Sequence, residues 1–294
     1  MASKAIICSF RKYTPFGDIY YQPIFDFFIS NLTKYKDEYD ALYILDSLWN
    51  FTPEDHLRVI EAKGVIVPSD PSLRYYDAYK VVLPQVKEDL VLFMDNDSIV
   101  YKEGIIRGTF LKLEPSLNNL DTYDVVSIID EIGTYKTSQL KKGNKLCPYF
   151  FATRKDLLMG YTDIDFGPNM PHSETLGKLT EAMLNDGVKV YEMEDDKPNI
   201  LFDGTKDGEK SKDTGVYHCR NGSLSAYLLA TKKYGNIDTY NEYLRDQPKS
   251  ETLRLCGWYQ IMGGNPSDIC SDLEITKEIW DNYIDKFKTY HGLI

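Results

Sequence analysis

Apolar runs of strand length alternate with amphipathic segments through the first hundred residues of the chain. The runs that are typical of buried strands span residues 4–10, 40–46, 65–67 and 90–94. Segments with apolar residues at helical spacing separate them, over residues 20–32, 53–63 and 74–86. Thr52 and Pro53 mark the start of the second helix, because threonine is a favoured N-cap and proline suits a first turn. Alternation of this kind predicts a parallel, doubly wound sheet.

The pattern becomes less regular after residue 100. Further strands are predicted over residues 124–130, 147–153, 188–193 and 216–218, with a helix over residues 173–186 that Gly187 ends. Residues 194–215 are rich in Asp, Lys and Gly, which is typical of a mobile loop. From Ser223 onward the sequence favours helices. We therefore expect one α/β domain over residues 1–222 and a C-terminal helical extension over residues 223–294 packed on it.

One predicted strand ends in two carboxylates. Leu90–Met94 is continuously apolar and leads directly into Asp95, Asn96 and Asp97. Acidic side chains at the end of a buried strand are costly to hold without a cation or hydrogen-bond donors nearby. Ligands of open α/β sheets bind beyond the carboxyl ends of the strands, and Mg²⁺ or Mn²⁺ prefers oxygen ligands shared with phosphates. The pair predicts a metal-assisted nucleotide site; the alternative is a polar turn that closes the strand.

Composition narrows the class of partner. The chain has 294 residues, 43% of them hydrophobic, and a formal net charge of −11. That charge disfavours a nucleic-acid-binding face, which needs clustered lysine and arginine. No segment reaches the roughly 20 apolar residues that cross a bilayer. The five cysteines show no C-x-x-C spacing, which favours reduced thiols and a cytoplasmic setting.

The block from residue 74 to residue 100, with its V-L-F-M-D-N-D-S-I-V run, resembles the D-x-D region of glycosyltransferases of the GT-A fold. The resemblance extends from the first strand to about residue 225. It implies a GT-A type, Rossmann-like mixed sheet flanked by helices. It also implies metal-dependent transfer of a sugar from a nucleotide-diphosphate sugar, most commonly a UDP-sugar, to a glycan or another hydroxyl acceptor. Mn²⁺ or Mg²⁺ would be the cofactor.

The same resemblance assigns roles to residues around the acidic pair. Asp97 would ligate the metal, and Asp95 would approach the ribose or the metal. Asp46, after the second strand, would bind the nucleobase, and Arg74 and Lys80 would reach the donor phosphates. Each assignment has a structural alternative: a strand-end cap for Asp46, and a solvated helix face for Arg74 and Lys80.

Two later residues complete the predicted site. His218 follows the predicted loop in a short strand, where many GT-A enzymes supply a metal-ligating histidine; an ordinary partly buried histidine is the alternative. Glu174 stands at the predicted start of the helix over residues 173–186. Inverting members of the family place a general base there, although this chain has Glu-Thr where the family has Glu-Asp or Asp-Thr. A glutamate favoured by the helix dipole is the alternative.

Competing functions stay open at this point. Transfer with inversion, as in family 2, is the leading hypothesis, with Glu174 as the base. A retaining enzyme similar to family 8 is the close rival, because Tyr79-Lys80-Val81-Val82-Leu83-Pro84 precedes the motif strand. A nucleotidyltransferase also uses paired carboxylates and a metal, but the chain lacks a Gly-rich loop after its first strand. A non-catalytic protein that binds sugar nucleotides is the remaining alternative.

Overall fold

The structure is a computed structural model. It describes residues 2–10, 22–46, 51–70, 73, 75–100, 102–115, 122–131, 144–166, 176–194, 215–218, 260 and 265. The predicted loop over residues 194–215, apart from its two ends, and the predicted helical extension, apart from two single residues, lie outside this part of the chain. Among the described residues, no helix has both the length and the apolar composition that a membrane span requires.

A mixed seven-stranded sheet forms the centre of the molecule. Its strands are β1 (Lys4–Phe10), β2 (Ala41–Asp46), β3 (Gly64–Pro68), β4 (Leu90–Asp95), β6 (Val125–Glu131), β7 (Asn144–Arg154) and β8 (Val190–Glu194). They lie side by side in the order β3-β2-β1-β4-β7-β6-β8. The first four are parallel, β7 is antiparallel to both β4 and β6, and β8 is parallel to β6. A separate two-stranded ribbon pairs β5 (Ser98–Val100) with β9 (Val216–His218).

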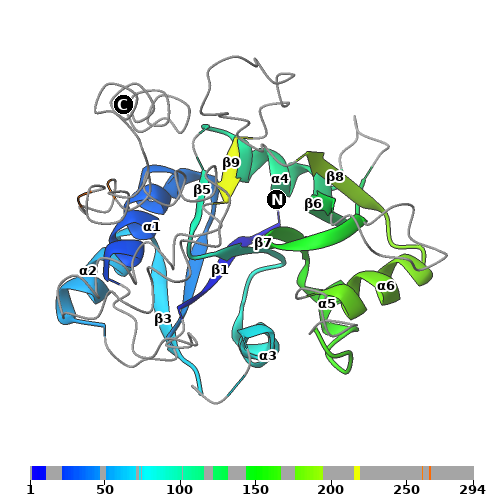
Figure 1. Cartoon of the computed structure of the whole chain (residues 1–294), viewed down its shortest axis with the longest axis horizontal. Coiled ribbons are helices and arrows are strands. Elements are labelled where there is room, and N and C mark those ends of the chain that lie inside the picture. The colour runs from blue at the N-terminus through cyan, green and yellow to red at the C-terminus, as the bar shows by residue number, and fades with distance from the viewer. Residues whose placement is uncertain are drawn as a thin grey trace, which may run out of the picture.

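Helices cover both faces of the sheet. They are α1 (Gln22–Lys34), α2 (Pro53–Glu61), α3 (Tyr75–Val82), α4 (Ile105–Leu113), α5 (Lys155–Met159) and α6 (Gly177–Asn185). In Figure 1, α3, α5 and α6 lie below the sheet, and α4 lies above it. The predicted fold class, a Rossmann-like mixed α/β sheet flanked by helices, is therefore confirmed.

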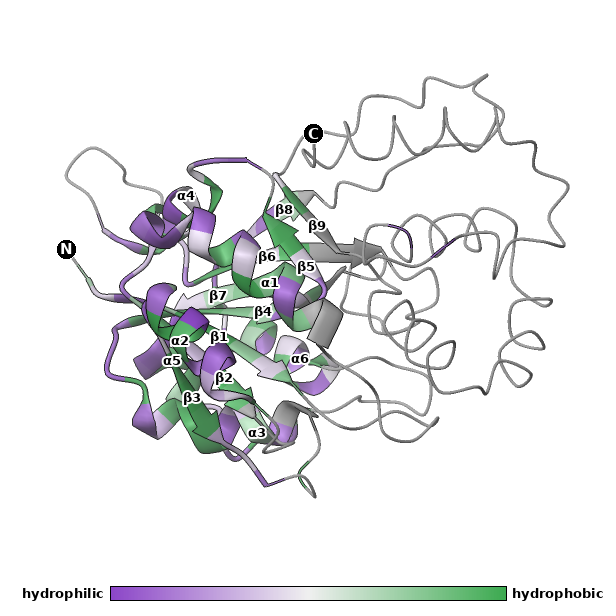
Figure 2. Ribbon diagram, turned by 90° about the vertical axis from the view of Figure 1, so that its left-hand side faces the viewer, coloured by the Kyte–Doolittle hydropathy of each residue, from purple (hydrophilic) through white to green (hydrophobic). Residues whose placement is uncertain are grey.

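Alternating strand residues supply two separate cores. Ile6 and Cys8 of β1 pack with α1, α2 and α4, whereas Ala5 and Ile7 face α3, α5 and α6. This split follows from the two-residue period of a strand, which sends successive side chains to opposite faces. Figure 2 shows the apolar strands inside the domain and hydrophilic residues on the outer helices. Each large apolar side chain buried in this way contributes about 1.5–3 kcal/mol.

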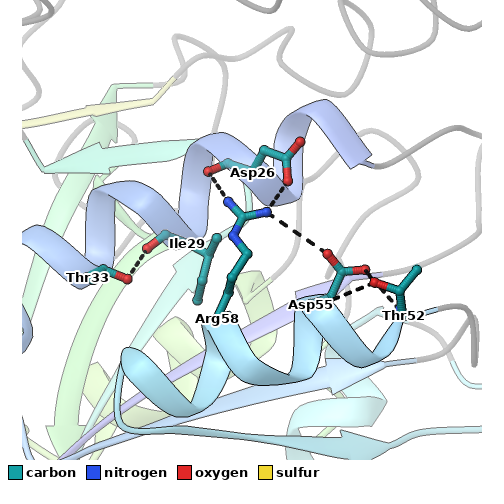
Figure 3. A network of polar contacts seen from close by, with 6 residues as sticks. All are labelled: Asp26, Ile29, Thr33, Thr52, Asp55 and Arg58. Carbon is teal, nitrogen blue, oxygen red and sulfur yellow. Dashed lines mark hydrogen bonds and ion pairs between the residues drawn. The ribbon is translucent and has the colours of Figure 1, made fainter.

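Polar contacts fix α1 against α2. Thr52 and Asp55 form the capping box that begins α2, each side chain accepting from the other's backbone N–H. One turn later, Arg58 forms an ion pair with Asp26 of α1, and its Nη2 donates to the Asp26 carbonyl at 3.2 Å (Figure 3). The predicted helix start at Thr52 is confirmed, and the second helix is tied to the first.

Several predicted boundaries differ from the structure, and three of them have a clear physical reason. The helix expected over residues 74–86 becomes a 3-10 turn at Leu83–Gln85, because Pro84 has no N–H for a helical bond. The helix expected from residue 173 begins at Gly177, after Leu176 takes a left-handed conformation with φ of 71°. The last strand of the sheet starts two residues late, at Val190. The amides of Gly187 and Val188 instead bond back to α6 carbonyls.

Candidate functional site

The order of the strands reverses at β1, which makes its carboxyl end the expected place for a ligand. The chain proceeds from β1 through β2 to β3 on one side, and then returns to place β4 on the other side of β1. Ligands of open α/β sheets bind outside the carboxyl ends of the strands where the order reverses in this way. The register puts Asp95 of β4 opposite Ser9 and Asp46 of β2 opposite Phe10. The two acidic residues thus flank β1, with backbones about 10 Å apart.

The acidic turn itself is held firmly. Asp95 is the last residue of β4, and Asp97 follows in the turn with only 8% of its surface exposed. Directly after it, the Ser98 hydroxyl donates to the carbonyl of Tyr149 in β7 at 3.0 Å. The turn is therefore attached to two strands of the main sheet, to β4 through the chain and to β7 through the Ser98 hydrogen bond.

Negative charge is concentrated at this point. Burial, together with the charges of Asp95 and Asp97, raises the pKa of the Cys8 thiol in β1 well above its usual value. Next to it, Ser9 is 2% exposed, and its hydroxyl has no hydrogen-bond partner among the described residues. Carboxylates with a buried hydroxyl form an oxygen-rich donor set, which suits a hard divalent cation better than a soft one.

The β5–β9 ribbon brings a distant segment to the acidic turn. Ser98 lies opposite His218 in the antiparallel register, although 120 residues separate them in the sequence. Opposed residues in such a ladder have Cα atoms about 4.5–5.5 Å apart. The backbone of His218 therefore lies beside the residue that follows Asp97. For His218, as for Asp46, only the backbone is described.

Other predicted site residues lie elsewhere or outside the described residues. The Lys80 ammonium of α3 donates to the Ile164 carbonyl and lies 4.7 Å from the centre of the Phe166 ring. Contact between Lys80 and a donor phosphate stays a prediction. Arg74 and Glu174 are outside the described part of the chain. The structure has α6 begin at Gly177, and a role of Glu174 as general base stays a prediction.

The described side chains do not by themselves complete a metal site. Among them, no three His, Cys, Asp or Glu residues gather in an arrangement that could hold a metal ion. Asp95 and Asp97 supply two carboxylates, and further ligands would have to come from His218, whose side chain is not described, or from a bound diphosphate. Such sharing of ligands with substrate phosphates is usual for Mg²⁺.

Two residues that support the β5–β9 ribbon were not identified from the sequence pattern. Asn31 of α1 binds both backbone groups of Val100 in β5. Gly215, with φ of 75°, packs so closely on α4 that a Cβ would lie 2.3 Å from Cγ1 of Ile105. Neither residue stands in a motif, because both act through contacts between segments far apart in the chain.

Comparisons with known proteins find only distant structural likenesses. No protein-family model and no curated protein matches the sequence. Among solved structures, the mannosyltransferase PcManGT from Pyrobaculum calidifontis, in complex with GDP-Man and Mn²⁺, is 11% identical with a TM-score of 0.47. The match covers 99% of this chain and 87% of that one.

Two further structures share the coarse arrangement. Glucosyl-3-phosphoglycerate synthase from Mycobacterium tuberculosis, with Mn²⁺, UDP and phosphoglyceric acid, is 15% identical over 66% of this chain and 68% of its own, with a TM-score of 0.43. CMP:2-keto-3-deoxy-manno-octonic acid synthetase complexed with CTP is 12% identical over 79% of this chain and 100% of its own, with a TM-score of 0.42. These neighbours transfer different groups, and likenesses this distant give the present chain neither a residue role nor a reaction.

Proposed function

We propose that this protein is a metal-dependent glycosyltransferase that moves a sugar from a nucleotide-diphosphate sugar to an acceptor hydroxyl. The observation that carries the proposal is that Asp95 and Asp97 lie next to the β5–β9 ribbon, beyond the end of β4, where the strand order reverses. Burying two carboxylates is costly, and a cation bound there together with a diphosphate would offset that cost.

In this proposal Asp97 and His218 hold Mn²⁺ or Mg²⁺, with Asp95 contributing to the metal or to the ribose. The ion, when bound, offsets charge that develops on the departing nucleoside diphosphate. Asp46 lies on the far side of β1 from Asp95, which suits contact with the nucleobase. UDP is the preferred nucleotide. Glu174 is the proposed base for an inverting reaction; in a retaining enzyme it would not have this role.

A thermal-shift experiment tests the site directly. UDP, GDP, CDP and dTDP are each added with Mn²⁺, Mg²⁺ or EDTA to the wild type and to Asp97→Ala. A ligand at a hundred times its Kd stabilises the native state by about 2.7 kcal/mol. We expect one diphosphate to raise the Tm of the wild type only with metal, and to have no such effect on Asp97→Ala. No shift with any diphosphate would overturn the proposal.

The products then identify the reaction. Release of a nucleoside diphosphate from a nucleotide sugar, dependent on metal and acceptor, is the expected result. Release of pyrophosphate from a nucleoside triphosphate would instead make the protein a nucleotidyltransferase. Binding without turnover would make it a sugar-nucleotide binding protein. The anomeric configuration of the product separates inversion from retention, and Glu174→Gln should abolish transfer only in the inverting case.

A further inference from the structure

A side-chain amide closes the outer edge of strand β5. The Asn31 Nδ2 donates to the Val100 carbonyl at 2.8 Å, and the Val100 N–H donates to the Asn31 Oδ1 at 2.9 Å. Through these two bonds the Asn31 amide pairs with the N–H and C=O of Val100 as the backbone of a neighbouring strand would. They satisfy backbone groups that would otherwise be unpaired at the edge of a two-stranded ribbon, which by itself is only marginally stable.

The amide comes from a rigid support. Asn31 lies on α1, which is packed on the sheet through Phe28 and Leu32, both at most 1% exposed. As Figure 3 shows, the same helix is tied to α2 by the contacts of Arg58 with Asp26. The position of β5 is thus set by α1 and the sheet together.

The direction of the Asn31 bonds determines how β5 meets β9. The N–H and C=O of Val100 bond to Asn31 and therefore point away from β9. Backbone groups of alternate residues in a strand point to the same side, so the N–H and C=O of Ser98, two residues earlier, also point away from β9. Ser98 and His218 therefore form a non-hydrogen-bonded pair, the type with the shorter Cα separation of about 4.5 Å. The spacing between the acidic turn and His218 follows from this arrangement.

We propose that Asn31 is a positioning residue for the metal site: its amide fixes β5, and through β5 fixes the distance between Asp97 and His218. This inference rests on the proposed function. Asn31 touches neither the metal nor the substrate. Groups that orient metal ligands in this indirect way typically change metal affinity 10- to 100-fold when they are removed.

The test compares Asn31 variants with two matched controls in the full-length protein. Asn31→Ala removes both bonds to Val100, and Asn31→Asp keeps the acceptor but loses the donor. Thr33→Ala removes a hydroxyl that donates to the Ile29 carbonyl within the same helix. Thr153→Val removes a buried hydroxyl that donates to the Asp124 carbonyl, and Thr153 pairs with Val91, toward the opposite end of β4.

Two quantities are measured well below the Tm of every variant. One is the Mn²⁺ affinity in the presence of UDP, from the electron paramagnetic resonance signal of free Mn²⁺. The other is hydrogen exchange of the amides in residues 98–100 and 216–218. We expect both Asn31 variants to bind Mn²⁺ at least about tenfold more weakly and to exchange faster in the ribbon. Both controls should match the wild type.

The outcomes separate the two proposals. Asn31 variants that bind Mn²⁺ like the wild type would overturn the positioning role and leave the proposed function standing. A wild type that binds no Mn²⁺ with UDP, despite a protected ribbon, would overturn the metal site and, with it, the role of Asn31. A loss of affinity in Thr33→Ala or Thr153→Val of equal size would show a general response to destabilisation, and would also overturn the specific role.

Discussion

Individual polar side chains join segments that are distant in the sequence. Glu38 is buried, and its carboxylate accepts from the N–H groups of Gly104 at 2.6 Å and Arg107 at 3.0 Å. Gly104 has no side chain to cap α4, so Glu38 satisfies the free amides of that helix from outside. Asp89 has a similar role just before β4, where its carboxylate accepts from the amide and the hydroxyl of Ser3.

The Asp89 contact predicts a specific pH dependence. The two hydrogen bonds from Ser3 lower the pKa of Asp89 below its usual value. A carboxyl whose pKa is lower in the folded state stabilises the protein above its unfolded pKa of about 3.9, and loses this effect as pH falls through the folded value. We expect Asp89→Asn to be less stable than the wild type at pH 7, with the difference shrinking below about pH 4. Urea unfolding from pH 7 to pH 2 measures it.

Asp37→Asn is the control for this prediction, because the Asp37 side chain is 89% exposed and lies 4.0 Å from the Lys63 ammonium. Its unfolding free energy should follow that of the wild type at every pH, as expected of an exposed ion pair. A constant difference between Asp89→Asn and the wild type across the whole range would contradict the role given to the Asp89 charge.

At the scale of elements, the β5–β9 ribbon is positioned from both of its strands. Asn31 holds β5, as described above. On the other strand, Gly215 precedes β9 in a left-handed conformation and contacts Ile105 of α4, whose N-terminus Glu38 caps. The ribbon is therefore supported by helices α1 and α4, which lie on the same face of the main sheet.

Gly215→Ala should disturb this arrangement strongly. A Cβ would lie 2.3 Å from Cγ1 of Ile105 and 2.9 Å from Cβ of Lys102, and φ of 75° disfavours any L side chain. Backbone strain of about 1–2 kcal/mol and overpacking of about 1–3 kcal/mol add to a loss of roughly 2–5 kcal/mol. Gly187→Ala is the matched control, because Gly187 has φ of 76° but, among the described residues beyond its chain neighbours, no atom lies within 4 Å of a Cβ.

Urea unfolding of both glycine variants distinguishes the two effects. Gly187→Ala should lose only the backbone part, about 1–2 kcal/mol. Gly215→Ala should lose more, and should also weaken Mn²⁺-dependent binding of UDP. Equal losses in the two variants, with unchanged binding, would mean that the contact with α4 does not position β9.

At the scale of the whole molecule, two buried clusters cover the two faces of the main sheet. Because helices α1 to α6 and these clusters already bury both faces of the sheet, we expect a protein ending at residue 222 to unfold cooperatively in urea and to keep metal-dependent stabilisation by a nucleoside diphosphate. A truncated protein without a cooperative transition would show that residues 223–294 are part of the same folding unit.

The sequence by itself determined the elements and the acidic turn. Strands such as Leu90–Asp95 are continuous apolar runs, and the start of α2 carries its own capping signals at Thr52 and Pro53. These features are local, since a buried strand needs apolar residues and a helix start needs a cap wherever they occur. Less local boundaries were wrong: the left-handed backbone of Leu176 starts α6 four residues later than predicted.

Only the tertiary structure decided which polar groups meet. The order β3-β2-β1-β4 puts Asp46 and Asp95 on either side of β1, and the pairing of Ser98 with His218 spans 120 residues. Asn31 and Gly215 carry no motif, because one acts through an amide facing a distant strand and the other through the absence of a side chain beside α4. Local sequence encodes propensity, whereas such contacts depend on how the whole chain packs, which no short pattern contains.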